Sequence, residues 1–64
     1  MSDLEKTILT IIDNNPGIGV NNLLKTITET RQKVSKNTVI MCIKHDLKYF
    51  CEFRGSKKRW RIFC

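Results

Sequence analysis

Apolar residues near the N-terminus recur at the spacing of one helix face. They lie three or four positions apart, at Leu4, Ile8, Ile11 and Ile12. This spacing predicts an amphipathic helix. Ser2 and Glu5 have the S-x-x-E spacing of a capping box at its start, and Asn14-Asn15-Pro16-Gly17 interrupts the pattern. We therefore expect a first helix over about residues 3–14.

Two later stretches repeat the helical spacing. The first has apolar positions Val20, Leu23, Leu24 and Ile27. It predicts a second helix over about residues 20–30, with Gly19 at the cap position. Ser35 is a good N-cap for a third helix over about residues 36–49. A helical wheel places four apolar residues of this third helix toward the core: Val39, Ile40, Ile43 and Leu47.

The opposite side of the third helix is left without an apolar partner. The wheel places Asn37, Met41, Lys44 and Lys48 on this side, with Thr38 and His45 at its border. A mostly polar ridge on a helix of a small domain is a candidate binding surface.

After Tyr49 the apolar period changes from helical to alternating. One side of the segment holds Cys51, Phe53, Trp60, Ile62 and Cys64. The other side holds Glu52, Arg54, Lys57, Arg59 and Arg61. This alternation predicts two strands, and Gly55-Ser56 suits a two-residue type II′ turn that would place Glu52 opposite Arg59. We expect a hairpin over about residues 50–64, which makes residues 1–64 a single α+β domain.

The positive charge gathers in the C-terminal third of the chain. The 64 residues carry a formal charge of +6. Residues 1–43 contribute +1 and residues 44–64 contribute +5. A local positive field attracts phosphate and releases its counterions on contact, so we expect a polyanionic partner.

Three cysteines, Cys42, Cys51 and Cys64, are an odd number. This number fits a closed disulfide framework poorly, so we expect free thiols and a reducing compartment. Cys42, Cys51 and Cys64 with His45 are a weak alternative as a Cys3His zinc site, because their spacing differs from that of known zinc motifs. Buried thiols that act as small apolar side chains are favoured instead, and no metal or other cofactor is expected.

The chain shows no apolar run of the roughly 20 residues that a membrane helix needs. Its first residues, MSDLEK, also lack the basic and then apolar order of a signal peptide. We therefore expect no membrane contact and a cytoplasmic protein, associated with the nucleoid if it is prokaryotic. A viral protein would work in the cytoplasm or nucleus of the host cell.

Particular stretches resemble the winged helix-turn-helix domains of prokaryotic and viral proteins. LEKTILTIIDNNPGIGVNNLLKTI is similar to the first two helices of many such domains, including the turn NPGI and the paired leucines. KVSKNTVIMCIKHDL is similar to their third helix. The connection from Thr28 to Lys33 is longer than in the compact family pattern. The resemblance implies three helices followed by a two-stranded β-hairpin wing.

The resemblance also implies double-stranded DNA as the partner and transcription regulation as the function. The third helix of such domains enters the major groove. The residues expected to read bases are Lys36, Asn37, Thr38 and Met41. Phosphate contacts are expected from Lys44, Lys48, Arg54, Lys57, Lys58, Arg59 and Arg61. Asn37 is the best candidate reader, because its amide can both donate to and accept from adenine.

Trp60 lies between two arginines and could stack on a base, but its parity with Ile62 predicts a place in the core. The six acids form no pair suited to acid–base chemistry, the single histidine has no evident nucleophile beside it, and no glycine-rich phosphate loop exists. An enzyme is therefore not expected.

Other partners stay open. A homodimer formed through the first helix would give a small module more contact with DNA. A winged-helix module can instead dock on a protein of the transcription or replication machinery. A third reading is binding to RNA or to an unusual duplex through Trp60. Winged-helix readers of left-handed DNA place tyrosine four residues after an asparagine in the third helix, and here Met41 stands at that spacing from Asn37.

Overall fold

The first helix, α1, spans Asp3–Asn14, as predicted. The computed structural model describes residues 2–56 and 59–64. The Ser2 hydroxyl accepts from the Glu5 amide at 3.2 Å, and the Glu5 carboxylate accepts from the Ser2 amide at 3.4 Å. This reciprocal pair is the capping box that the sequence indicated, and it satisfies donors that the first turn of a helix leaves unpaired.

The second helix, α2, spans Val20–Glu29, within one residue of the prediction. The two residues before it form a short strand, β1 (Ile18–Gly19), which the sequence did not indicate. Its partner is β3, with Ile18 opposite Ile62. Two residues show no alternation, so only the contact with a distant strand makes this segment a strand.

The third helix begins as predicted and ends early. α3 (Lys36–Met41) starts at Ser35, whose hydroxyl accepts from the Thr38 amide at 3.2 Å. It continues into a π-helical segment, η1 (Cys42–Asp46), where the Leu47 amide donates to the Cys42 carbonyl at 3.0 Å. The prediction of a helix to residue 49 is wrong by three residues, because the chain turns after Asp46 to enter the hairpin.

The hairpin consists of β2 (Glu52–Ser56) and β3 (Arg59–Phe63), with β3 between β1 and β2 in a three-stranded antiparallel sheet. The predicted turn at Gly55-Ser56 is wrong, because both residues pair with β3. Glu52 faces Phe63 and not Arg59. Gly55 does have a positive φ of 126°, but inside the strand, where a Cβ would overlap the Arg59 carbonyl oxygen. The connecting residues Lys57 and Lys58 lie outside the described residues.

One apolar core joins the three helical segments to the inner face of the sheet. Its fully buried side chains are Ile8, Ile12, Leu23, Ile27, Val39, Ile43, Leu47 and Ile62. All of them occupy positions that the apolar spacing predicted. The long connection between α2 and α3 is held against α1, since the Gln32 amide donates to the Thr7 hydroxyl at 3.0 Å.

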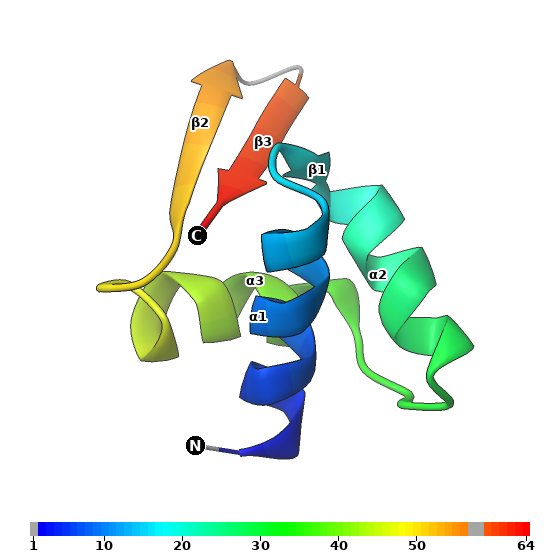
Figure 1. The fold of residues 1–64 in the computed structure, drawn as a ribbon. Helices are drawn as coiled ribbons and strands as arrows, with labels where there is room; N and C mark the ends of the chain where they lie inside the picture. The colour runs from blue at the N-terminus through cyan, green and yellow to red at the C-terminus, as the bar shows by residue number, and fades with distance from the viewer. Residues whose placement is uncertain (1, 57–58) are drawn as a thin grey trace.

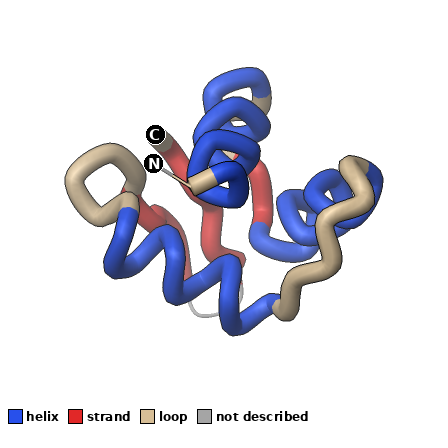
Figure 2. The backbone as a smooth tube through the Cα atoms, turned by 90° about the horizontal axis from the view of Figure 1, so that it is seen from below, coloured by secondary structure: helices blue, strands red, loops and turns tan. Residues whose placement is uncertain are grey.

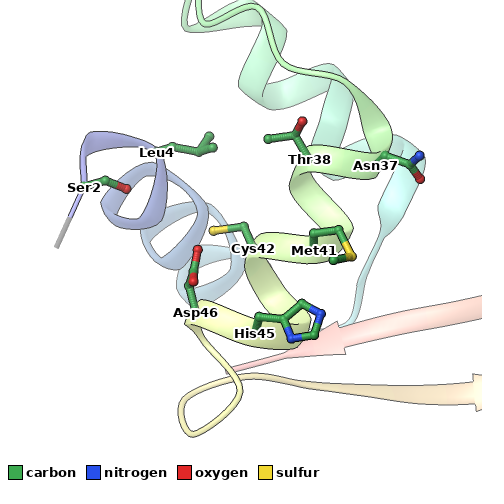
Figure 3. A pocket seen from close by; sticks show the side chains of 8 residues that line it. All are labelled: Ser2, Leu4, Asn37, Thr38, Met41, Cys42, His45 and Asp46. Carbon is green, nitrogen blue, oxygen red and sulfur yellow. The ribbon is translucent and has the colours of Figure 1, made fainter.

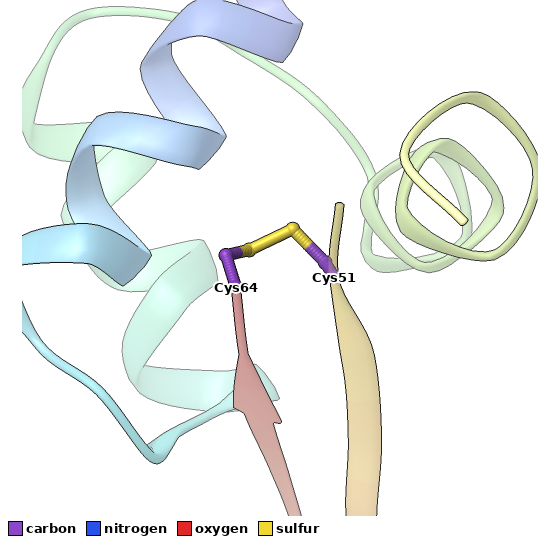
Figure 4. Close-up of a disulfide and its surroundings, with 2 residues drawn as sticks. All are labelled: Cys51 and Cys64. Carbon is purple, nitrogen blue, oxygen red and sulfur yellow. A yellow bond between two sulfur atoms is a disulfide. The ribbon is translucent and has the colours of Figure 1, made fainter. Parts of the chain in front are cut away.

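The expectation of three free thiols is wrong. Cys51, just before β2, and Cys64, just after β3, form a disulfide across the base of the hairpin (Figure 4). Glu52 pairs with Phe63, and this register brings together Cys51 and Cys64, which are the residues next to them in the chain. Cys42 is the free cysteine and is buried. The cysteine count alone could not reveal a pair that depends on strand register.

Figure 1 shows the hairpin standing above α3, with α1 in front and α2 to one side. The view in Figure 2, turned by 90°, places α3 and the outer part of the hairpin on the side of the molecule away from α1. None of the described helices is long and apolar enough to cross a membrane.

Candidate nucleic-acid interface

The exposed crest of the third helical segment is a row of three side chains. Asn37, Met41 and His45 follow one another and point away from α1 (Figure 3). All three are exposed. The helical wheel placed Lys44 in this row and His45 at its border. The π-helical segment has more residues per turn, so residue 45 takes the place above Met41.

Thr38 lies beside the crest and points toward Leu4 of α1 (Figure 3). Its hydroxyl is 2.8 Å from the Ser35 hydroxyl, so it takes part in the cap of α3. Of the four predicted base readers, Thr38 is therefore the one whose polar group already has a partner within the fold. Lys36, Asn37 and Met41 are exposed.

A shallow groove separates the third helical segment from α1, and we call it the α1-side groove. Its lining residues are Ser2, Leu4, Asn37, Thr38, Met41, Cys42, His45 and Asp46. Burial, together with the negative charges of Asp46 and Glu5, raises the pKa of the Cys42 thiol above its ordinary value of 9.0. This thiol stays protonated and is a poor nucleophile or metal ligand.

A second groove separates the third helical segment from the hairpin, and we call it the hairpin-side groove. Its inner part is lined by Val20, Ile40, Lys44, Phe53 and Trp60. Its outer part shares three of these residues and adds Gly19, Asn21, Asn22, Lys36 and Arg59. The groove therefore joins two lysines of the third helical segment to an arginine of the hairpin. Among the described residues that line this groove, none is acidic.

Trp60 is 45% exposed, so the prediction that it belongs to the core is wrong. Its parity was read correctly, because Gly55, its partner across the hairpin, shares a face with Phe53 and Ile62. The alternation of apolar and polar residues shows on which face of a strand a residue lies. It does not show how far along the strand that residue lies from the core. β3 extends past the core, and Trp60 packs edge-to-face on Phe53 with ring centroids 6.4 Å apart.

The other face of the hairpin carries Arg54 and Arg61, which are opposite one another and exposed. Arg54 donates to Glu52 through its Nε at 2.7 Å and lies over the Phe63 ring, 5.0 Å from its centroid. Arg59 belongs to the same face by register, since it pairs with Ser56, but it lies at the start of β3 and lines the outer part of the groove, which Arg54 and Arg61 do not.

Lys48 also lies away from the hairpin-side groove, in a hollow that it shares with Arg54. It follows the end of η1, and its Nζ lies 5.0 Å from the centroid of the Tyr49 ring. The structure thus brings Lys36, Lys44 and Arg59 to one groove and leaves Lys48, Arg54 and Arg61 elsewhere. The predicted phosphate contacts Lys57 and Lys58 lie outside the described residues.

Asn21 and Asn22 were missed by the sequence reasoning. They occupy the first turn of α2 and line the hairpin-side groove beside Lys36 and Arg59. The available signal was a pair of adjacent amides on the polar side of α2, which by itself indicates only a solvated helix face. Their place in the groove depends on how α2 packs against α3.

The described residues hold little that suggests metal chemistry. Among residues 2–56 and 59–64, no three His, Cys, Asp or Glu side chains gather where they could hold a metal ion. Cys51 and Cys64, two members of the alternative zinc set, are joined in the disulfide.

The candidate interface is a cationic, partly aromatic groove next to an exposed helix. Comparison of the chain with protein-family models, with curated proteins and with solved structures found no match.

Proposed function

We propose that this chain is a winged helix-turn-helix domain that binds double-stranded DNA and acts as a small transcriptional regulator. The order of elements supports the proposal: three helices, then a hairpin whose outer part lies on the same side as α3 (Figure 2). The α3 helix would enter the major groove, which is wide enough to admit a helix. The β2–β3 hairpin would be the wing.

The observation that carries the proposal is the charge of the hairpin-side groove. Lys36 and Lys44 from the third helical segment and Arg59 from the hairpin line this one groove, without an acidic residue in its lining. A DNA strand that passes between the helix and the hairpin would meet all three cations. Phosphate contacts of this kind supply most of the affinity of DNA-binding proteins and set their position on the duplex.

The crest of α3 and η1 would face the base edges. The Asn37 amide can donate to and accept from adenine, a pairing worth about 1–3 kcal/mol of discrimination. Met41 would supply an apolar contact, and His45, in the same row, is a further candidate that the structure adds. Arg54 and Arg61 would reach phosphate only from the far face of the hairpin, so we assign them a smaller share of the affinity.

Salt dependence tests the proposal. Binding to mixed-sequence duplex DNA would be measured by fluorescence anisotropy at about 50 mM and about 200 mM salt. Six phosphate contacts give a slope of log K against log salt of about −5, which is roughly a thousandfold weakening over this range. Absence of binding at the lower salt concentration would contradict the proposal and favour docking on a protein partner.

Two variants separate base reading from phosphate contact. Site selection from random duplexes should give a consensus for the unmodified protein and a relaxed consensus for Asn37→Ala, with an unchanged salt slope. Lys57→Ala combined with Lys58→Ala should instead lower the salt slope by about 1.8 and keep the consensus. If both variants changed the same property, the division of roles would be wrong.

A further inference from the structure

Trp60 packs edge-to-face on Phe53 but remains exposed in a cationic groove. Trp60 is 45% exposed, although it lies on the face of the hairpin that carries the buried Ile62. Exposing a large aromatic ring to water is unfavourable, because the protein loses the favourable free energy of burying its apolar surface. The other exposed aromatic residues, Tyr49 and Phe50, lie in the turn before β2 and do not line this groove.

The surroundings of Trp60 define what could cover it. The inner part of the groove is a hollow of about 290 Å³, near the lower end of the range for small-ligand sites. Apolar side chains of Val20, Ile40 and Phe53 form its walls together with Trp60. The Lys44 ammonium lies 6.0 Å from the centroid of the Phe53 ring. A flat apolar group with an attached negative charge fits this combination.

The outer part of the groove adds groups suited to a nucleotide. Lys36 and Arg59 supply positive charge there, and the amides of Asn21 and Asn22 can donate and accept hydrogen bonds. Stacking of a base on an aromatic side chain contributes about 1–3 kcal/mol and tolerates any base. Inside a duplex the faces of the bases are covered by their neighbours, so only an unpaired base can present its face to a ring within a groove.

We propose that the hairpin-side groove binds one unpaired nucleotide of DNA, with its base against Trp60 and its phosphate near Lys44 and Arg59. The inference rests on the proposed DNA-binding function and narrows its substrate to DNA that carries an unpaired nucleotide, such as a bulge, an overhang or a melted step. Charge complementarity favours this choice, because the described residues that line the groove include Lys36, Lys44 and Arg59 and no acid.

The test compares two labelled duplexes of the same sequence, one fully paired and one with a single extra thymidine, by fluorescence anisotropy at about 50 mM salt. The unmodified protein should bind the bulged duplex about tenfold more tightly, in line with the contribution of one stacked base. Trp60→Leu should remove this preference and leave the affinity for the paired duplex within about twofold, because the phosphate contacts remain.

Two variants control for general effects. Tyr49→Leu replaces an 86% exposed aromatic residue outside the groove and should keep the preference. Trp60→Phe should retain part of it, because a smaller ring still stacks, and circular dichroism and thermal melting of every variant would show that the fold is intact. Equal affinity of the unmodified protein for the two duplexes, or an equal loss for both in Trp60→Leu, would overturn the inference while leaving the proposed function in place.

A short oligo(dT) separates the two proposals further, because Trp60 is the single tryptophan and reports on its own surroundings. Quenching of its fluorescence by oligo(dT), without binding to either duplex, would support the groove and contradict duplex recognition. No quenching and no duplex binding would contradict both. Equal quenching by a polyglutamate peptide of matched charge, or stronger quenching by oligo(U), would overturn the choice of DNA as the occupant.

Discussion

The two grooves beside the third helical segment differ in charge, although the same segment supplies one wall of each. The α1-side groove contains Asp46, and the negative charges of Asp46 and Glu5 act on Cys42 in its lining. The hairpin-side groove contains Lys36, Lys44 and Arg59 without an acid. The third helical segment itself supplies Asp46 to one groove and Lys36 and Lys44 to the other, and the hairpin adds Arg59.

The difference has a structural origin. The first turn of α1 carries Asp3 and Glu5, where negative charge complements the positive end of the helix dipole and completes the capping box. Asp3 and Glu5 do not line the α1-side groove, whose acidic lining residue Asp46 belongs to η1, but the charge of Glu5 acts on Cys42 in that lining. The hairpin has no helix dipole to complement, so its strands can carry arginines and an exposed tryptophan next to α3.

The largest expected effect comes from opening the base of the hairpin. Replacing Cys51→Ser and Cys64→Ser removes the disulfide between residues 13 positions apart. Loss of a disulfide that closes a loop of this length should lower the free energy of unfolding by about 3 kcal/mol. Urea unfolding followed by Trp60 fluorescence measures this loss, and a reductant should affect the unmodified protein but not the variant. An unchanged unfolding midpoint would mean that the Cys51–Cys64 disulfide does not stabilise the hairpin.

Removing charge from the hairpin-side groove should have the next largest effect. Lys36→Ala with Lys44→Ala should weaken duplex binding about a hundredfold at about 50 mM salt and reduce the salt slope by about 1.8. Lys6→Ala with Lys25→Ala is the matched control, because these two exposed lysines line neither groove. Equal losses in the two variants would show that overall charge, not the groove, attracts DNA.

Two glycine variants test the shape of the hairpin-side groove. Gly55→Ala places a Cβ against the Arg59 carbonyl at a φ of 126° and should cost about 1–3 kcal/mol of unfolding free energy. Gly19→Ser, at the N-cap of α2, meets its nearest neighbour at 4.0 Å and should gain a few tenths of a kcal/mol from the new cap. Thermal unfolding would rank the three proteins, and a tolerated alanine at residue 55 would contradict the observed strand register.

The smallest effect concerns pH and the α1-side groove. The pKa of Cys42 is raised in the folded protein, so above about pH 9 the unfolded chain releases a proton that the folded state keeps. The stability contributed by the neutral thiol is complete below the ordinary pKa and is lost as pH rises. The stability gap between the unmodified protein and Cys42→Ala should narrow there, by at most about 1.4 kcal/mol per pH unit. A gap that does not change with pH would mean that the thiol is not desolvated.

Helix starts were predicted well because their signals are local. Ser2 and Ser35 cap α1 and α3 through bonds to amides three residues away, and such short-range geometry can be read from spacing alone. The end of the third helix was predicted poorly, because η1 and the turn after it depend on the route into the hairpin. The strand β1 was missed because its partner β3 lies far away in the sequence. The hairpin register was missed because the turn was expected at Gly55-Ser56, and both residues pair with β3 instead.

The candidate site was likewise predicted in part, where local spacing decided the position of a residue. Asn37 and Met41 were placed on the exposed crest from the helical period. The groove that joins Lys44 to Trp60 could not be predicted, because it forms where α2, the third helical segment and the hairpin meet. Trp60 itself was assigned to the correct face and the wrong environment.

The sequence by itself determined where the helices start, most of the residues that make the core, and that positive charge gathers toward the C-terminus. These properties follow from capping, periodicity and composition, which involve neighbours along the chain. Only the tertiary structure decided which strand residues pair, that Cys51 and Cys64 are joined, and which cations share a groove with Trp60. Each of these depends on how one element pairs with or packs against another, and such contacts leave no periodic signal in the sequence.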